Sequence, residues 1–82
     1  MPKVRRADLP PALFQHLLDR IQQRKISAGQ LGLLAVWLDT QPEVPAGPWF
    51  KRFPEMIVCG DGALVRTFLL PDQVPLGEEI AN

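Results

Sequence analysis

Two long stretches without proline alternate with proline-rich segments along this chain. No proline occurs in residues 12–41 or 55–70, although nine are distributed over the rest of the sequence. Proline lacks a backbone N–H and clashes inside helices and central strands, so regular structure should form within these two windows. The spacing of hydrophobic residues predicts helices in the first window and strands in the second.

The first window predicts a helical hairpin over residues 10–40. An amphipathic helix is indicated by apolar residues at helical spacing, which are Leu13, Phe14, Leu17, Leu18 and Ile21. Residues 27–40 form a second helix that is apolar nearly all round, and we expect it to be covered on several sides with Leu34 fully buried. Ser27, followed three residues later by Gln30, has the spacing of a capping box and predicts where that helix begins.

The second window predicts an antiparallel β-hairpin over residues 55–70. Two runs rich in strand-forming residues flank Gly60-Asp61-Gly62, and Asp-Gly is a strong signal for a type I′ turn. A two-residue turn would pair Cys59 with Leu64, and a three-residue turn would shift that register by one position. Both registers remain open at this point.

Apolar residues occur on both faces of the predicted β-hairpin, with Val65 and Leu69 expected on the same face. The helical hairpin can cover one face only, and a two-stranded sheet is not stable alone. The other face needs a second copy, a partner protein, or the acidic extended tail of residues 71–82 as its cover. The candidate partner-binding residues are Val65, Leu69, Val74, Leu76 and Ile80.

A proline-punctuated segment, residues 41–54, separates the two windows and is predicted to be a loop. It contains Trp49-Phe50-Lys51-Arg52-Phe53, in which two cations stand between aromatic residues. One interpretation is that unpaired bases stack on the rings while the cations hold phosphates. The alternative, which we favour, is that the rings anchor the loop to the core, because so small a core needs most of its aromatic residues.

Charge is distributed unevenly, although nine basic and nine acidic residues balance to a net charge of zero. Residues 1–9 form a basic N-terminal arm, and more cations follow in the first helix. Such asymmetry can mark a surface for an anionic partner, but it also arises by chance in short chains. Binding to RNA or single-stranded nucleic acid would use Arg5, Arg6, Arg20, Arg24, Lys25, Trp49, Lys51 and Arg52.

The residues needed for catalysis or metal binding are scarce. His16 and Cys59 are the only histidine and cysteine, which argues against a zinc site, and no nucleotide-binding motif is present. A thiol enzyme using Cys59 is a weak third hypothesis, because activation requires a neighbouring base or cation. The lone cysteine favours the cytoplasm, and no apolar run is long enough for a membrane span.

The sequence therefore predicts a single small α+β domain over residues 1–82, with a helical hairpin, a proline-rich loop and an antiparallel β-hairpin in that order. We expect a non-enzymatic protein-protein interaction module without cofactors or metals, such as a regulator, an inhibitor or a subunit of an assembly. Its partner would be another protein or a second copy of itself, with nucleic acid as the alternative.

Overall fold

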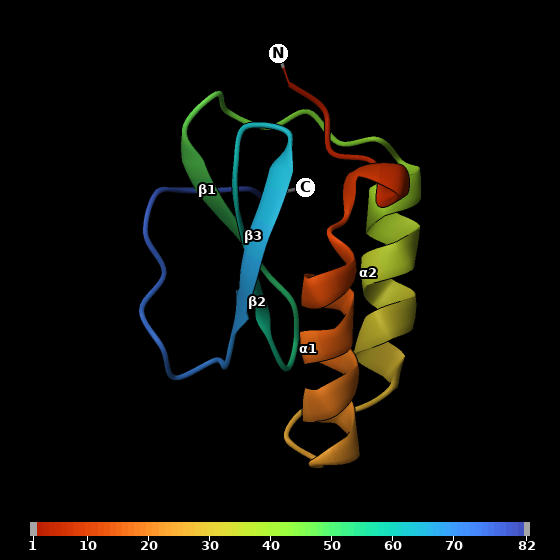
Figure 1. Cartoon of the computed structure of the whole chain (residues 1–82). Helices are drawn as coiled ribbons and strands as arrows, with labels where there is room; N and C mark the ends of the chain where they lie inside the picture. The colour runs from red at the N-terminus through yellow and green to blue at the C-terminus, as the bar shows by residue number, and fades with distance from the viewer. Residues whose placement is uncertain (1, 82) are drawn as a thin grey trace.

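The computed structural model describes residues 2–81, with the backbone alone for Asp8, so residues 1 and 82 of the predicted arm and tail lie outside the described residues. The predicted α+β class is confirmed, with the helices preceding the strands (Figure 1). In chain order the elements are the short 3-10 helix η1 (Arg6–Asp8), α1 (Pro11–Gln22), α2 (Gly29–Asp39), β1 (Pro48–Arg52), β2 (Ile57–Asp61), β3 (Leu64–Leu69) and β4 (Glu78–Glu79).

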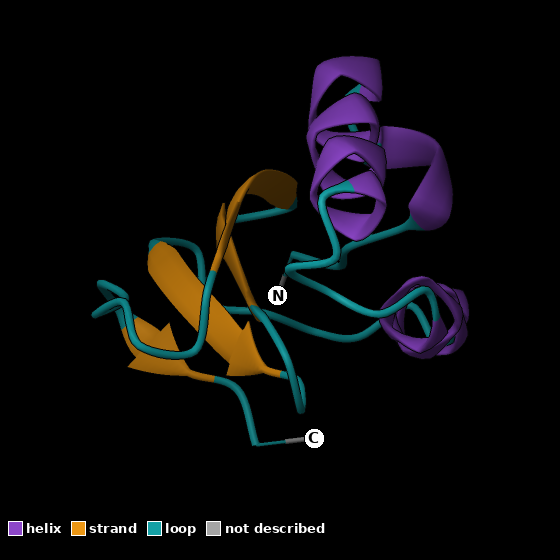
Figure 2. Cartoon of the chain, turned by 90° about the horizontal axis from the view of Figure 1, so that it is seen from below, coloured by secondary structure: helices purple, strands orange, loops and turns teal. Residues whose placement is uncertain are grey.

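The sheet has four strands in the order β3-β2-β1-β4, so it is larger than the predicted hairpin. β1 and β3 each run antiparallel to β2, whereas β4 runs parallel to β1. Two predictions are thereby corrected, because the expected loop of residues 41–54 contains β1 and the expected extended tail of residues 71–82 contributes β4. Both helices lie on the same side of the sheet (Figures 1 and 2).

β1 forms because its side chains alternate between two buried environments. Trp49 is completely buried among the core residues on the helix side, and Phe50, with 8% of its surface exposed, points to the outer face. Pro48 begins the strand, a position where proline is tolerated. Because prolines surround this segment, the sequence did not predict the strand, which pairs with β2 on one side and with β4 on the other.

A β-bulge sets the register between β2 and β3, and it differs from both predicted registers. Asp61 pairs with Leu64, so the turn consists of Gly62 and Ala63, and only Gly62 has a positive φ, of 59°. A type I′ turn needs positive φ at both positions, so this expectation is also wrong.

The bulge falls where Gly60 pairs with Val65 but Cys59 pairs with Thr67, which leaves Arg66 as the extra residue. This insertion breaks the two-residue alternation along β3. Val65 therefore points into the core, where it is 1% exposed, while Leu69 lies on the outer face opposite Ile57. The prediction that Val65 and Leu69 share a face is wrong for this reason.

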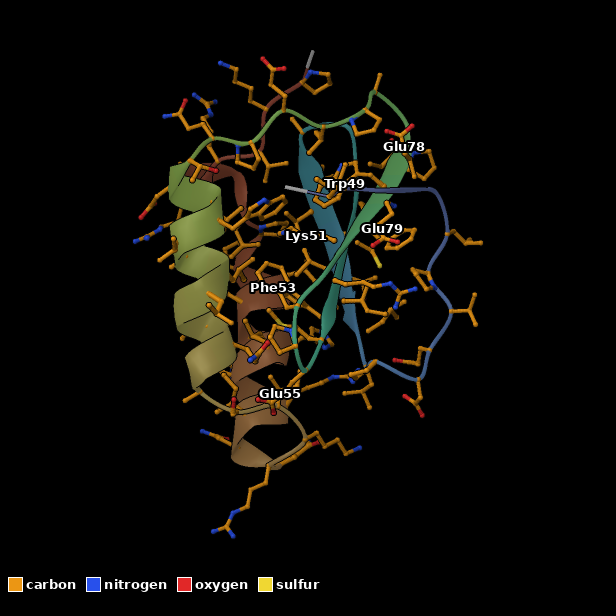
Figure 3. The ribbon with its side chains drawn as sticks, turned by 180° about the vertical axis from the view of Figure 1, so that it is seen from behind. Trp49, Lys51, Phe53, Glu55, Glu78 and Glu79 are labelled. Atoms are coloured by element: carbon orange, nitrogen blue, oxygen red, sulfur yellow. The ribbon has the colours of Figure 1, made fainter. Side chains whose placement is uncertain are left out.

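The carboxylate of Glu55, in place of the predicted capping box, accepts hydrogen bonds at the start of α2. The residue before the helix is Ala28, and its side chain makes no capping hydrogen bond. Glu55, in the connection between β1 and β2, instead accepts hydrogen bonds from the Ser27 hydroxyl at 2.6 Å and the Ser27 amide at 3.2 Å (Figure 3). The Gln30 side chain donates to the Glu55 carboxylate at 3.4 Å and accepts from the Glu55 amide at 3.2 Å.

The N-terminal segment is attached to the rest of the fold. Val4 is completely buried, its amide donates to the Pro42 carbonyl at 3.1 Å, and the Val44 amide donates to the Pro2 carbonyl at 2.9 Å. The Arg6 guanidinium pairs with Asp39 at the end of α2, with 2.7 Å between nitrogen and oxygen. Residues 2–9 are therefore docked along α2 and the following segment, and do not extend as an arm.

The core lies between the helices and the inner face of the sheet, with Leu34 of α2 1% exposed, as predicted. The expectation that α2 would be covered on several sides is wrong, however. Leu33 is 45% exposed and Val36 67% exposed, so one face of this apolar helix is open. The other buried hydrophobic residues in this cluster are Val4, Leu17, Ile26, Trp37, Leu38, Val44, Trp49, Met56, Val58, Val65, Phe68 and Ile80.

Candidate interaction surface

The outer face of the sheet carries a groove of about 390 Å³, here called the outer groove. The segment of residues 70–77, which joins β3 to β4, forms one wall and is the long blue connection in Figure 1. Beside Leu69, Val74 and Leu76, the groove is lined by Cys59 of β2 and by Arg66 and Thr67 of β3. The groove thus combines side chains that are far apart in the sequence.

Val74 and Leu76 have little packing within the chain. Their exposed fractions are 86% and 81%, the two largest among the exposed large hydrophobic residues of the described chain. Leu69 is half-buried in the same groove. Isolated exposed apolar residues are common, but these two lie together beside an apolar groove, which makes this part of the surface the strongest candidate for a site.

The remaining two candidate partner-binding residues lie elsewhere. Val65 is part of the core on the helix side, and Ile80 is 8% exposed and belongs to the same cluster. Neither side chain is accessible to a partner. The structure therefore brings together Leu69, Val74 and Leu76 from the predicted set.

The wall formed by residues 70–77 has a local hydrogen bond at its start and is attached to β1 at its end. At its start, the Leu70 amide donates to the Gln73 side chain at 2.8 Å. At its end, the Ile80 amide donates to the Phe50 carbonyl at 2.7 Å. Gly77 has a φ of 100° and lies against Pro48 too closely for a side chain to be added. The tail is consequently docked through its last residues, while its apolar side chains at 74 and 76 project outward.

The aromatic and basic residues of β1 do not form a stacking platform. The Trp49 ring is completely buried and its Nε1 donates to the Gly62 carbonyl at 2.8 Å. The Lys51 Nζ lies 5.4 Å from the centre of the Phe53 ring and 5.8 Å from that of Trp37 (Figure 3). The rings anchor the sheet to α2, which leaves Trp49 unavailable to a nucleic-acid base in this conformation.

The other basic candidates are distributed over several elements. Arg52 lies over the Phe50 ring at 5.4 Å and within 3.7 Å of the Glu79 carboxylate, while Arg6 pairs with Asp39. Arg5 is exposed on the N-terminal segment. Arg20 belongs to the last turn of α1, and Arg24 and Lys25 follow that helix.

Cys59 is the free thiol of the outer groove, and burial raises the pKa of this thiol above its ordinary value. A raised pKa lowers the fraction of thiolate at neutral pH, opposite to what activation of a nucleophile requires. Among the side chains that the structure describes, no three from histidine, cysteine or acidic residues are grouped so that they could hold a metal ion. Residues 2–81 contain no helix with the length and apolar character needed to cross a membrane.

Sequence reasoning found Val74 and Leu76, because apolar residues stand out in an acidic tail, but it missed the groove beside them. Cys59 and Thr67 line it only because the bulge aligns them across β2 and β3.

No family model matches the sequence, and neither a curated protein nor a solved structure is significantly similar to the chain.

Proposed function

We propose that this chain is a small, non-enzymatic interaction module that binds another polypeptide in the outer groove. The observation that carries the proposal is the position of Val74 and Leu76, which are held beside an apolar groove yet are almost fully exposed. Binding would remove these side chains from water, and each fully buried Val or Leu contributes about 1.5–3 kcal/mol. An apolar segment of the partner fits this surface best.

The surrounding structure supports a binding role over a catalytic one. Burial raises the pKa of the Cys59 thiol, which lowers the fraction of nucleophilic thiolate at neutral pH. The strand β3 is an edge strand, so it also offers unpaired backbone groups that an extended segment of a partner can use. A free thiol suits the cytoplasm, which we propose as the site of action.

The test compares two double variants in affinity capture followed by mass spectrometry. Val74→Gln with Leu76→Gln should abolish capture of the partner, because both changes place amides on the groove wall. Leu33→Gln with Val36→Gln is the matched control, since it changes two exposed hydrophobic residues on α2. The captured protein should then bind the purified chain directly, and the complex should protect Cys59, which lines the groove, from alkylation.

A second copy occupying the groove would appear as a dimer in light scattering that the Val74 and Leu76 changes dissociate. The proposal is contradicted if capture and self-association are unaffected by these changes. It is equally contradicted if the α2 control variant abolishes binding while the groove variant retains it.

A further inference from the structure

A second cavity lies between α1 and the edge strand β3, with a volume of about 250 Å³. His16 and Arg20 line it from the helix, and Arg66 and Thr67 line it from the strand. Leu13 and Phe68 supply its apolar wall. We call this cavity, defined by these six residues and Ala12, the Arg66 pocket.

The local structure explains why these side chains meet. Ala12, His16 and Arg20 are spaced four residues apart, so they lie one above another on the face of α1 beside β3. Ala12 is the smallest of the three and leaves space that a longer side chain would fill. On the strand, Arg66 is the extra residue of the β-bulge, a feature that redirects side chains and often occurs next to functional sites.

The charges around the Arg66 pocket are unbalanced. Two arginines and a histidine are among the residues that line it, and no acidic residue lines it in the described part of the chain. Ion pairs within the chain involve Arg6 and Arg52, whereas neither Arg20 nor Arg66 pairs with a carboxylate among the side chains that the structure describes. Two like charges that converge on one cavity without a counter-charge favour an anion between them.

From this geometry we propose that the Arg66 pocket binds a small oxyanion, a phosphate or carboxylate group, attached to an apolar group. Arginine is well suited to such groups, because its fork of N–H donors matches two oxygens of a phosphate or carboxylate. Thr67 would supply a further donor through its hydroxyl group, and the Leu13 and Phe68 side chains would contact the apolar part of the ligand. This inference uses a cavity distinct from the outer groove, with Arg66 and Thr67 at the boundary of both.

Nuclear magnetic resonance titrations with phenyl phosphate, benzoate and inorganic phosphate test the proposal. His16 is the only histidine, so its ring protons give an isolated signal beside the pocket. Phenyl phosphate or benzoate should shift the His16 ring and Thr67 amide signals saturably at constant ionic strength. Comparing these two probes distinguishes phosphate from carboxylate, and inorganic phosphate, which lacks the ring, should bind more weakly than phenyl phosphate.

Arg20→Gln and Arg66→Gln should each weaken binding roughly tenfold or more, the effect expected from losing a charge-assisted hydrogen bond. Arg24→Gln is the matched control, since Arg24 follows α1 and does not line the pocket, and it should leave affinity unchanged. Thermal unfolding of each variant verifies that it folds, and either arginine variant alone suffices for the test. Signal shifts that never saturate would overturn the proposal. It would also be overturned if Arg24→Gln and Arg20→Gln weaken binding to the same extent.

Discussion

Gly60 lies directly against the indole ring of Trp49, in the position that any side chain would occupy. A Cβ atom at residue 60 would overlap the Trp49 ring and come within 2.8 Å of the Leu64 carbonyl oxygen. The pairing of Trp49 with Gly60 across β1 and β2 creates this contact. The glycine therefore makes room for one of the two tryptophan side chains of the core, and this one is completely buried.

Replacing Gly60 with alanine should destabilise the protein by about 1–3 kcal/mol, because the added methyl group displaces Trp49 or bends β2. Chemical denaturation monitored by tryptophan fluorescence measures this change. Gly32→Ala provides the control, since its Cβ would meet no atom within 4 Å and the residue lies inside α2. That substitution should stabilise the helix by up to about 1 kcal/mol. Equal effects of the two substitutions would contradict the overlap with Trp49.

Leu34→Ala should cost about 2–5 kcal/mol, because the Leu34 side chain is buried and its loss leaves a cavity between α2 and the rest of the core. For a domain of this size such a loss approaches the whole free energy of unfolding. Val36→Ala, at a mostly exposed position of the same helix, should change the denaturation midpoint very little. A Leu34→Ala variant that melts like the parent protein would refute its place in the core.

Glu55→Ala should weaken the start of α2, because Ser27 and Gln30 lose the carboxylate that accepts their hydrogen bonds. We expect a loss of about 1 kcal/mol and faster amide hydrogen exchange at residues 29–32. Glu43→Ala removes another exposed carboxylate and serves as the control. Unchanged exchange at the start of α2 would show that the Glu55 contacts do not stabilise the helix.

Ile80→Ala should lower the free energy of unfolding by about 2 kcal/mol, at the lower end of the range for buried isoleucine because the adjoining strand β4 is only two residues long. Val74→Ala, in the same tail but exposed, should have no measurable effect. Urea denaturation of both variants distinguishes a docked C-terminal segment from a free one. If both variants match the parent protein, the β1–β4 pairing contributes nothing to stability.

Alkylation of Cys59 should be slow at neutral pH, and its midpoint with rising pH should lie above that of glutathione. Burial raises the pKa of the thiol, so the reactive thiolate forms only at higher pH than in a solvated thiol. Iodoacetamide labelling across a pH series gives the midpoint, and labelling in denaturant should return it to the ordinary value. A native midpoint at or below that of glutathione would contradict the effect of burial.

The proline-free windows, with their runs of apolar residues typical of helices and of strands, were sufficient to predict α1, α2, β2 and β3. β1 was missed because prolines surround it, although Pro48 begins the strand and is not inside it. β4 is two residues long and carries no periodicity, so only its pairing with Trp49 and Phe50 of β1 identifies it. Pairing between segments that are far apart in the sequence produces no local residue pattern from which the strand could be predicted.

The candidate surfaces were predictable to different degrees. Val74 and Leu76 were found as apolar residues in a polar tail, but the sequence could not distinguish them from Ile80, which is buried. The Arg66 pocket was not foreseen at all. The pocket depends on the β-bulge, which shifts the strand register by one residue and places Arg66 opposite α1. No single residue in the sequence indicates that such a register shift occurs.

The contacts of Glu55 with Ser27 and Gln30 have a consequence for the order of folding. They join residues separated by 25 and 28 positions, so they form only after the chain between them has closed into a loop. α2 is only 11 residues long and lacks a side-chain cap of its own, and short helices are marginal in isolation. We therefore expect the second helix and the sheet to form together, in one cooperative step, instead of the helical hairpin preceding the strands.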